Sequence, residues 1–267
     1  MNACLVWRKT SFWHTDHFIN YSYPSRMSNE DLHEFYENYH TNHLKHAINE
    51  FPFRKAYWDS RIKNFLPASR SSVFLDLGCG NGDFLLYLKN NGFENITGVE
   101  YSGEMKEISE KSVKGIRVVY SDATTFLKET PQTYDFILCA HLLEHFEKTK
   151  VLETFKLVKE KLNPGGHFVV MTPNFASPFG IPIAFGDFTH ITHFSGPSMA
   201  QLAGLSDLEI RHIGGNGPVA FGFGGWLRSF LWKFILKPIG KLIFSNNSRK
   251  YGDVVDPELI AVFTKKS

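Results

Sequence analysis

The sequence has few cysteines, little net charge and no long apolar run. Its 267 residues include three cysteines, Cys4, Cys79 and Cys139, whose number and spacing suit neither a disulfide framework nor a zinc site. The formal net charge is +2, so the chain as a whole has no electrostatic attraction to nucleic acid. No apolar run approaches the roughly 18 residues of a membrane-spanning helix. We therefore expect a protein of a reducing, cytoplasmic setting, with no nucleic-acid partner.

Composition divides the chain into parts. Residues 1–26 are rich in aromatic and histidine side chains without a period, and we expect a disordered extension ahead of one domain over residues 27–267. Within that domain, helices are predicted over residues 27–70, where apolar side chains recur at helical spacing. Residues 215–257 form a basic, aromatic insertion before the last predicted strand.

From residue 73 onward, short apolar runs alternate with amphipathic segments. Strands are predicted at residues 73–77, 96–100, 116–120, 134–139, 167–171, 208–213 and 258–264. Helices are predicted at residues 83–90, 103–111, 123–129, 146–162 and 198–205. Nearly all-apolar strands in successive β-α units predict a doubly wound α/β fold. Its mostly parallel, seven-stranded sheet is expected to have helices on both faces.

A glycine-rich loop follows the first predicted strand and leads directly into a helix. It contains Gly78, Gly80 and Gly82. Glycines permit a tight turn and let a ligand approach the backbone, while the start of the helix offers free N–H donors. Glu100 ends the next strand, where a carboxylate can accept hydrogen bonds from both hydroxyls of a ribose. The combination predicts a site for a nucleoside cofactor.

The acids beside this loop discriminate between two cofactors. The dinucleotide fingerprint G-x-G-x-x-G would place its third glycine at Asp83, and an acid there would repel a pyrophosphate. Asp76, just before the loop, suits an amino group better than a phosphate. S-adenosylmethionine, which has no phosphate and carries a cationic sulfonium, is therefore favoured over NAD. An NAD-dependent oxidoreductase and a non-catalytic, membrane-associated cofactor-binding protein are the alternatives.

Residues 73–82, VFLDLGCGNG, resemble the first motif of class I S-adenosylmethionine-dependent methyltransferases. Segments farther along agree with that family in order and spacing, so the resemblance covers residues 73–172; they are 98–102, 121–123, 134–145 and 162–166. The resemblance implies a Rossmann-like fold with S-adenosylmethionine as cofactor. The implied cofactor site consists of Asp76, Gly78, Cys79, Gly80, Gly82, Glu100, Tyr101, Asp122, Ala123 and Cys139.

The resemblance also implies separate roles for these residues. Glu100 is implied to bind the ribose, and Tyr101 to border the adenine. Asp122 is implied to read the adenine amino group, with Ala123 beside the ring. The loop after the fourth strand is implied to reach the methionine part of the cofactor and the substrate.

Histidines near the carboxyl ends of the strands are candidates for acceptor chemistry. A hydroxyl acceptor needs a general base, and histidine suits that task at neutral pH. His190 and His141 are the catalytic candidates, with Asp187 able to orient a histidine. Glu144 and His145 either cap the following helix or contact the substrate. No metal site is expected, because no further ligand cluster accompanies these histidines.

A looser resemblance concerns the acceptor. Residues 187–194, followed by Leu202 and Gly204, resemble a subgroup of polysaccharide-cluster and ubiquinone-pathway O-methyltransferases. This resemblance implies O-methylation of a small molecule, a sugar or a lipid-linked glycan.

The insertion has a composition of its own. Residues 226–250 contain six basic residues and no acid, interleaved with large apolar side chains. Such a segment is typical of an interfacial helix on an anionic membrane. The alternative is a lid or helical hairpin that packs against the domain. Peripheral membrane contact is therefore predicted through residues 226–244.

Overall fold

A computed structural model describes residues 51–244 and 250–265 of the chain. The predicted extension over residues 1–26 lies outside these ranges, as does much of the predicted N-terminal helical region. The described part of that region contains helix α2 (Phe51–Ile62) and the short 3-10 helix η2 (Lys63–Phe65).

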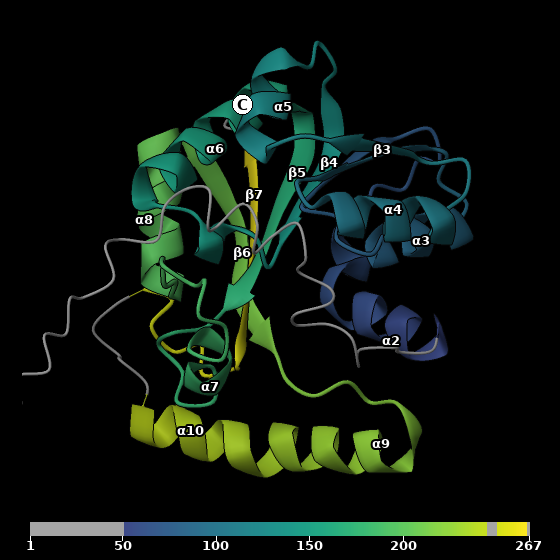
Figure 1. The fold of residues 1–267 in the computed structure, drawn as a ribbon. Helices are drawn as coiled ribbons and strands as arrows, with labels where there is room; N and C mark the ends of the chain where they lie inside the picture. Colours follow the sequence, from purple (N-terminus) through teal and green to yellow (C-terminus); the bar gives the residue numbers. More distant parts are fainter. Residues whose placement is uncertain (1–50, 245–249, 266–267) are drawn as a thin grey trace, which may run out of the picture.

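The strands form one seven-stranded sheet in the order β3-β2-β1-β4-β5-β7-β6 (Figure 1). They are β1 (Val73–Leu77), β2 (Asn95–Glu100), β3 (Arg117–Tyr120), β4 (Tyr134–Ala140), β5 (Leu162–Pro173), β6 (Leu208–Asn216) and β7 (Glu258–Lys265). Strands β1 to β5 pair in parallel, whereas β7 is antiparallel to both β5 and β6. The predicted doubly wound, mostly parallel sheet is confirmed. The strand order reverses at β1, where such sheets bind ligands beyond the carboxyl ends of their strands.

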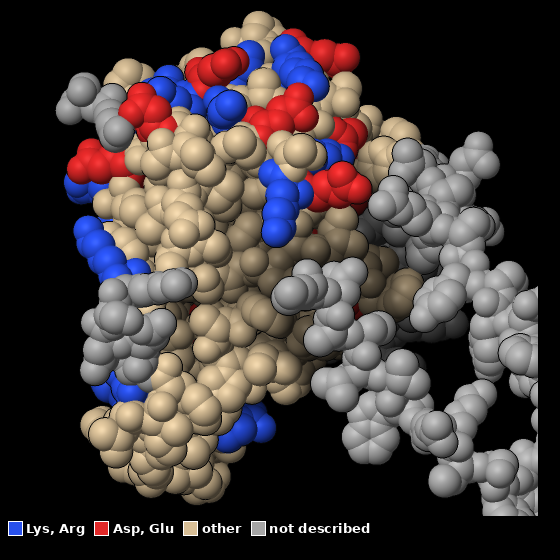
Figure 2. Space-filling view, turned by 90° about the vertical axis from the view of Figure 1, so that its left-hand side faces the viewer, with Lys and Arg blue, Asp and Glu red and all other residues tan. Residues whose placement is uncertain are grey.

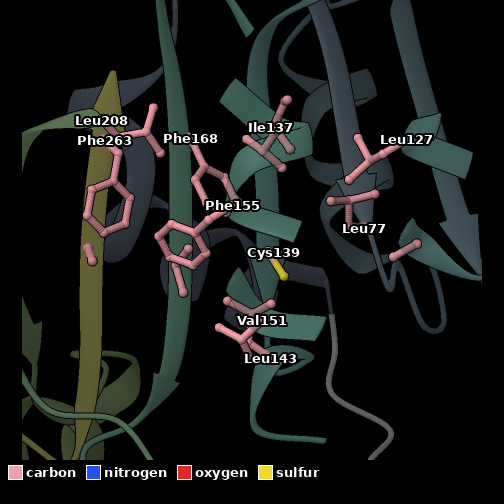
Figure 3. Close-up of a cluster of buried hydrophobic side chains, with 14 of the residues drawn as sticks. Leu77, Leu127, Ile137, Cys139, Leu143, Val151, Phe155, Phe168, Leu208 and Phe263 are labelled. Carbon is pink, nitrogen blue, oxygen red and sulfur yellow. The ribbon is translucent and has the colours of Figure 1, made fainter. Parts of the chain in front are cut away.

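Helices cover both faces of the sheet (Figure 1). Besides α2 they are α3 (Asp83–Asn90), α4 (Gly103–Ser112), α5 (Ala123–Glu129), α6 (Lys148–Lys161) and α8 (Gly196–Ser206). One hydrophobic core lies between the sheet and α5, α6 and α8, and Figure 3 shows Phe155 of α6 close to Phe168 and Phe263 of the strands. A second core lies on the other face, against α2 and α3.

Successive strand residues alternate between these two cores. In β1, Leu75 and Leu77 belong to the first core and Phe74 to the second. In β5, Phe168 enters the first core and Val169 the second. The alternation follows from the two-residue period of a strand. Full burial of each large side chain contributes roughly 1.5–3 kcal/mol, so both faces need helices.

The predicted helix over residues 146–162 begins later than expected. A 3-10 turn, η3 (Leu143–His145), comes first, and α6 starts at Lys148 after an extended Glu147. Strand β5 already begins at Leu162, where it pairs with Tyr134.

The insertion after β6 forms one continuous helical stretch across one end of the molecule (Figure 1). It runs from α9 (Gly222–Leu231) through a π-helical turn, η4 (Trp232–Leu236), into α10 (Lys237–Phe244). The short helix α7 (Ile181–Ala184) follows β5. Within residues 51–244 and 250–265, no helix has the length and apolar character needed to cross a bilayer.

Candidate active site

A cavity of about 1320 Å³ lies at the carboxyl edge of the parallel strands. It is bordered by the ends of β1, β2 and β4, by α2, and by residues 183–190. Most residues of the predicted site line it, namely Asp76, Gly78, Cys79, Gly80, Glu100, Tyr101, Asp122, Ala123, His141 and His190. The fold thus gathers side chains that are far apart in the sequence into one chamber.

The glycine loop has a backbone that requires glycine. Gly78, Gly80 and Gly82 have φ values of 71°, 51° and 82°, in the left-handed region that side chains with a Cβ avoid. A Cβ at Gly82 would lie 2.6 Å from the Ser109 hydroxyl oxygen. Gly82 precedes α3 behind the loop and is absent from the cavity lining, so its place is structural.

Glu100 is held at the end of β2 by backbone donors. Its Oε2 accepts a hydrogen bond from the N–H of Gly80 at 2.8 Å. Its Oε1 accepts from the N–H groups of Tyr101 and Ser102 at 2.9 and 2.8 Å. These bonds join the glycine loop to the start of α4 through one carboxylate. Each oxygen has further lone pairs, which suits the predicted bonds to ribose hydroxyls.

Asp76 makes this end of the cavity receptive to a cation. Its side chain is 3% exposed, and burial together with the nearby Glu100 raises its pKa to about 8. A cationic ligand beside both acids would relieve their repulsion, whereas a pyrophosphate would add to it. The donor set therefore fits S-adenosylmethionine, with its ammonium and sulfonium groups, better than NAD.

The predicted adenine region contains Tyr101, which lines the cavity, and an oriented carboxylate. The rings of Tyr101 and Tyr120 stack with centroids 6.3 Å apart. Asp122 caps α5 through Thr124 and Thr125, and its Oδ2 accepts a bond from Lys150 at 2.6 Å. Burial would raise the pKa of Asp122, but the bond from Lys150 and others outweigh it and lower the pKa. Its contact with the adenine amino group stays a prediction.

The structure does not bring Cys139, a predicted cofactor residue, into the cavity lining. Its side chain is fully buried in the first hydrophobic core, close to Leu143 and Val151 (Figure 3). Burial raises the pKa of its thiol well above the usual range. Alternation along β4 turns Cys139 toward α6, and the next residue, Ala140, lines the cavity instead.

His141 lies between two carboxylates. Its Nε2 is 3.1 Å from Glu258 Oε1, and its Nδ1 is 3.3 Å from Glu144 Oε1. Burial would lower its pKa, but the bonds to Glu144 and Glu258 outweigh that effect and raise the pKa to about 10. The side chain is 42% exposed, toward the cavity that it lines. An imidazolium cannot take up a further proton, so this environment favours His190 over His141 as the general base.

Glu258 anchors His141 to α2. The Nε of Arg61 donates to Glu258 Oε2 at 2.6 Å, and the hydroxyl of Tyr57 donates to Oε1 at 2.9 Å. Sequence reasoning missed these three residues as parts of the site. Glu258 lies about 200 residues from the other two, and no local pattern links them; the only signal was an acid at the start of the last predicted strand.

His190 has the geometry of a general base. Its Nδ1 lies 2.9 Å from the carbonyl oxygen of Ala184. Since a carbonyl only accepts, Nδ1 carries a proton, and in the neutral imidazole Nε2 then has the lone pair. Nε2 is 4.0 Å from Glu144 Oε1. Glu144 is 2% exposed, and within the described residues its one close cation is His141, 3.3 Å from Oε1. Proton uptake by His190 would give this buried carboxylate a second cationic neighbour.

Asp187, predicted to orient a histidine, is linked to His145 through the hydroxyl of Thr189. Thr189 donates its hydroxyl to Asp187 Oδ1 at 2.6 Å, and His145 Nδ1 lies 2.8 Å from the same hydroxyl oxygen. Burial lowers the pKa of His145, which keeps it neutral. The ligand atoms of Glu144, His145 and His190 lie within 4.8 Å of one another, so these three side chains could hold a metal ion.

Asn174 is structural, whereas Glu144 follows one of its two sequence-based alternatives. Asn174 is buried and donates to the carbonyl oxygens of Val254 and Asp256. It therefore anchors the chain beyond β5. Glu144 precedes the extended Glu147 and does not cap α6; its side chain lines the cavity.

Comparison with known families gives the same assignment as the geometry. A family model described as a methyltransferase domain matches residues 51–213. The chain belongs to the class I S-adenosylmethionine-dependent methyltransferases. The predicted enzyme class and cofactor are thereby confirmed.

Relatives of this methyltransferase match in part of their length. A ubiquinone biosynthesis O-methyltransferase of Rickettsia bellii is 29% identical over 133 residues, covering 49% of this chain and 53% of that protein. The ubiquinone biosynthesis O-methyltransferase of Proteus mirabilis is 30% identical over 158 residues, covering 51% of this chain and 62% of that protein. The chain thus spans less than two thirds of the length of the curated relatives that it matches.

A solved structure shares the fold. The S-adenosylmethionine-dependent methyltransferase of Archaeoglobus fulgidus superposes on this methyltransferase with a TM-score of 0.62 at 19% identity. The match covers 85% of this chain and 99% of that chain.

Proposed function

We propose that this methyltransferase methylates an oxygen atom, with His190 as the general base. The observation that carries the proposal is the placement of the His190 ring. Its Nδ1 lies 2.9 Å from the Ala184 carbonyl oxygen, which leaves Nε2 of the neutral imidazole to accept a proton, and the buried Glu144 carboxylate lies 4.0 Å from Nε2. The relatives named as O-methyltransferases support the choice of oxygen.

The roles of the cavity residues follow from their positions. When bound, S-adenosylmethionine supplies an electrophilic methyl group. Asp76 would face its cationic part and Glu100 its ribose, and the glycine loop would border the bound cofactor. His190 Nε2 accepts the proton of the acceptor hydroxyl, and Glu144 stabilises the imidazolium that results. His141, already protonated, balances the charges of Glu144 and Glu258 and keeps that side of the cavity ordered.

The acceptor is a small molecule, a sugar or a lipid-linked glycan. The part of the cavity lined by Phe53, Ile183 and Val219 is apolar, which favours an acceptor with a hydrophobic portion. Peripheral membrane contact through residues 226–244 belongs to the same proposal, because a lipid-linked acceptor is held at a membrane surface.

Product analysis with a labelled methyl donor tests the proposal. We expect label in an O-methyl group when small-molecule and lipid extracts are offered to the purified chain. A His190→Gln variant should lose about 10²–10⁴-fold in kcat, while its affinity for S-adenosylhomocysteine stays unchanged. Label on nitrogen, or full turnover by the variant, would contradict the proposal.

A second candidate mechanism is favoured by the donor set of Glu144, His145 and His190. A divalent cation held there would bind the acceptor oxygen directly and lower its pKa. Elemental analysis of the purified chain separates the two. Stoichiometric metal whose removal stops turnover supports the cation, whereas turnover that survives chelation supports His190 as the base.

A further inference from the structure

The helical stretch from residue 222 to residue 244 exposes large apolar side chains over most of its circumference. Trp226 is 56% exposed and Leu242 is 86% exposed. The others are Phe223, Leu227, Phe230, Leu231, Phe234, Ile235, Leu236, Ile239, Ile243 and Phe244. Contiguous apolar surface of this kind marks an interaction site. The alternative of a lid that buries these residues does not describe this arrangement.

A narrow face attaches the helix to the domain. The indole N–H of Trp232 donates to Asp256 Oδ1 at 3.0 Å, and Lys237 binds the same carboxylate. The π-helical turn η4 lies between Trp232 and Lys237 and brings residues five apart onto one side. Gly240 lies on the same side of the helix, where an added Cβ would be 3.3 Å from the ring of Phe179. The opposite face therefore has a fixed orientation.

The exposed face has an aromatic row beside cations. The rings of Trp226 and Phe230 lie 5.7 Å apart, and those of Phe230 and Phe234 lie 4.8 Å apart. Arg228 and Lys233 are exposed on the same helix. The sequence has no Asp or Glu from residue 210 to residue 252. Acidic side chains gather in the upper part of Figure 2, away from the end where this helix lies.

We propose that this helix is a docking surface for an anionic lipid bilayer. Aromatic and aliphatic side chains enter the headgroup boundary, and Arg228 and Lys233 bind lipid phosphates. A protein partner would require acids placed opposite these cations and a matching hydrophobic groove. A bilayer supplies both an apolar layer and negative charge along the whole helix.

The segment that leads into this helix borders the methyltransferase cavity. Strand β6 runs parallel to β5, so its carboxyl end, from which the helix departs, lies at the same edge of the sheet as the cavity. Val219, just before α9, lines the cavity, and the ring of Phe221 contacts Phe53 of α2. Docking would bring this edge of the sheet to the membrane surface. If the proposed function holds, the acceptor is an amphiphile that resides in the membrane; this step rests on that proposal.

Vesicle co-sedimentation of the full chain tests the inference. We expect the wild type to sediment with vesicles of equal parts phosphatidylcholine and phosphatidylglycerol, and far less with phosphatidylcholine alone. Replacing Trp226, Phe230 and Phe234 by Ser should weaken binding by about tenfold or more. Arg228→Gln with Lys233→Gln should weaken it about 30-fold, since each cation near an anionic surface contributes about fivefold.

Matched controls lie away from the helix. Leu205→Ser removes an exposed apolar side chain of α8, and Lys156→Gln removes an exposed cation of α6; both should bind vesicles like the wild type. Wild type that stays in the supernatant with both vesicles overturns the inference. So does a dimer, seen by light scattering, that the triple Ser variant dissociates. Binding of S-adenosylhomocysteine by the same preparations tests the cofactor site independently. A failure of membrane docking can therefore be distinguished from a failure of the proposed function.

Discussion

At the scale of single residues, charge decides the chemistry of the cavity. Asp76 and Glu100 face one ligand site, and burial with the nearby Glu100 raises the pKa of Asp76 to about 8. At neutral pH Asp76 is therefore mostly protonated before a ligand arrives. A cationic ligand favours the carboxylate, so binding and loss of a proton are linked.

Proton release on ligand binding is a prediction of this arrangement. At pH 7, binding of S-adenosylhomocysteine should release about one proton from Asp76. Titration calorimetry in buffers of different ionisation enthalpy measures that number. An Asp76→Asn variant should bind more weakly and release none. Equal proton release by the wild type and the variant would refute this assignment of the buried acid.

The His141 cluster predicts a pH dependence of stability. The pKa of His141 is raised to about 10 by Glu144 and Glu258, above its unfolded value of about 6.5. Its contribution is therefore complete below about pH 6.5 and is lost as the pH rises through about 10. The Tm of the wild type should therefore decrease as the pH is raised from about 6.5 to about 10. The Tm of the His141→Gln variant should change less over the same pH range. Parallel profiles in thermal scans would argue against the charged pair.

Sequence reasoning identified single residues where a local motif exists. The glycine loop, Glu100 and His190 lie in such motifs, and all reach the cavity. Cys139 was misplaced because a one-residue alternation along a strand decides which face a side chain occupies. Arg61 and Glu258 were missed because their pairing depends on how α2 docks at the end of β7, which no local pattern encodes.

At the scale of elements, the sequence predicted the regular β-α units well. Helices α3 and α5 have the predicted bounds, because glycine, the capping Asp122 and apolar periodicity mark their ends. The start of α6 and the length of β5 were not predicted, since residues 143–147 and 162–166 take their conformation from tertiary contacts. Within the predicted basic insertion, residues 222–244 are helical, and Trp232 in the π-helical turn donates to Asp256, near the end of the insertion.

The turn before α3 gives a test at this scale. Gly82→Ala should destabilise the fold by about 2–4 kcal/mol, since a left-handed Ala costs roughly 1–2 kcal/mol and its Cβ would meet the Ser109 hydroxyl at 2.6 Å. Gly115→Ala is the matched control, with a φ of 84° and no atom within 4 Å of the added Cβ. Denaturant unfolding measures both. Equal losses would show that the contact with Ser109 contributes nothing.

At the scale of the whole molecule, the cavity and the exposed helix share one edge of the sheet. The parallel strands end there, α2 and β7 close one side through Arg61 and Glu258, and α9 and α10 cross the same end (Figure 1). Periodicity and motifs predict each component, whereas their common location follows from the strand order.

The most direct measurement is titration calorimetry of the purified chain with S-adenosylhomocysteine and with NAD. We expect S-adenosylhomocysteine to bind and NAD not to bind. Glu100→Ala should weaken the binding by about 1–3 kcal/mol, the scale of a lost buried hydrogen-bond partner. Binding of NAD that Glu100→Ala abolishes, or a folded chain that fails to bind S-adenosylhomocysteine, would contradict it.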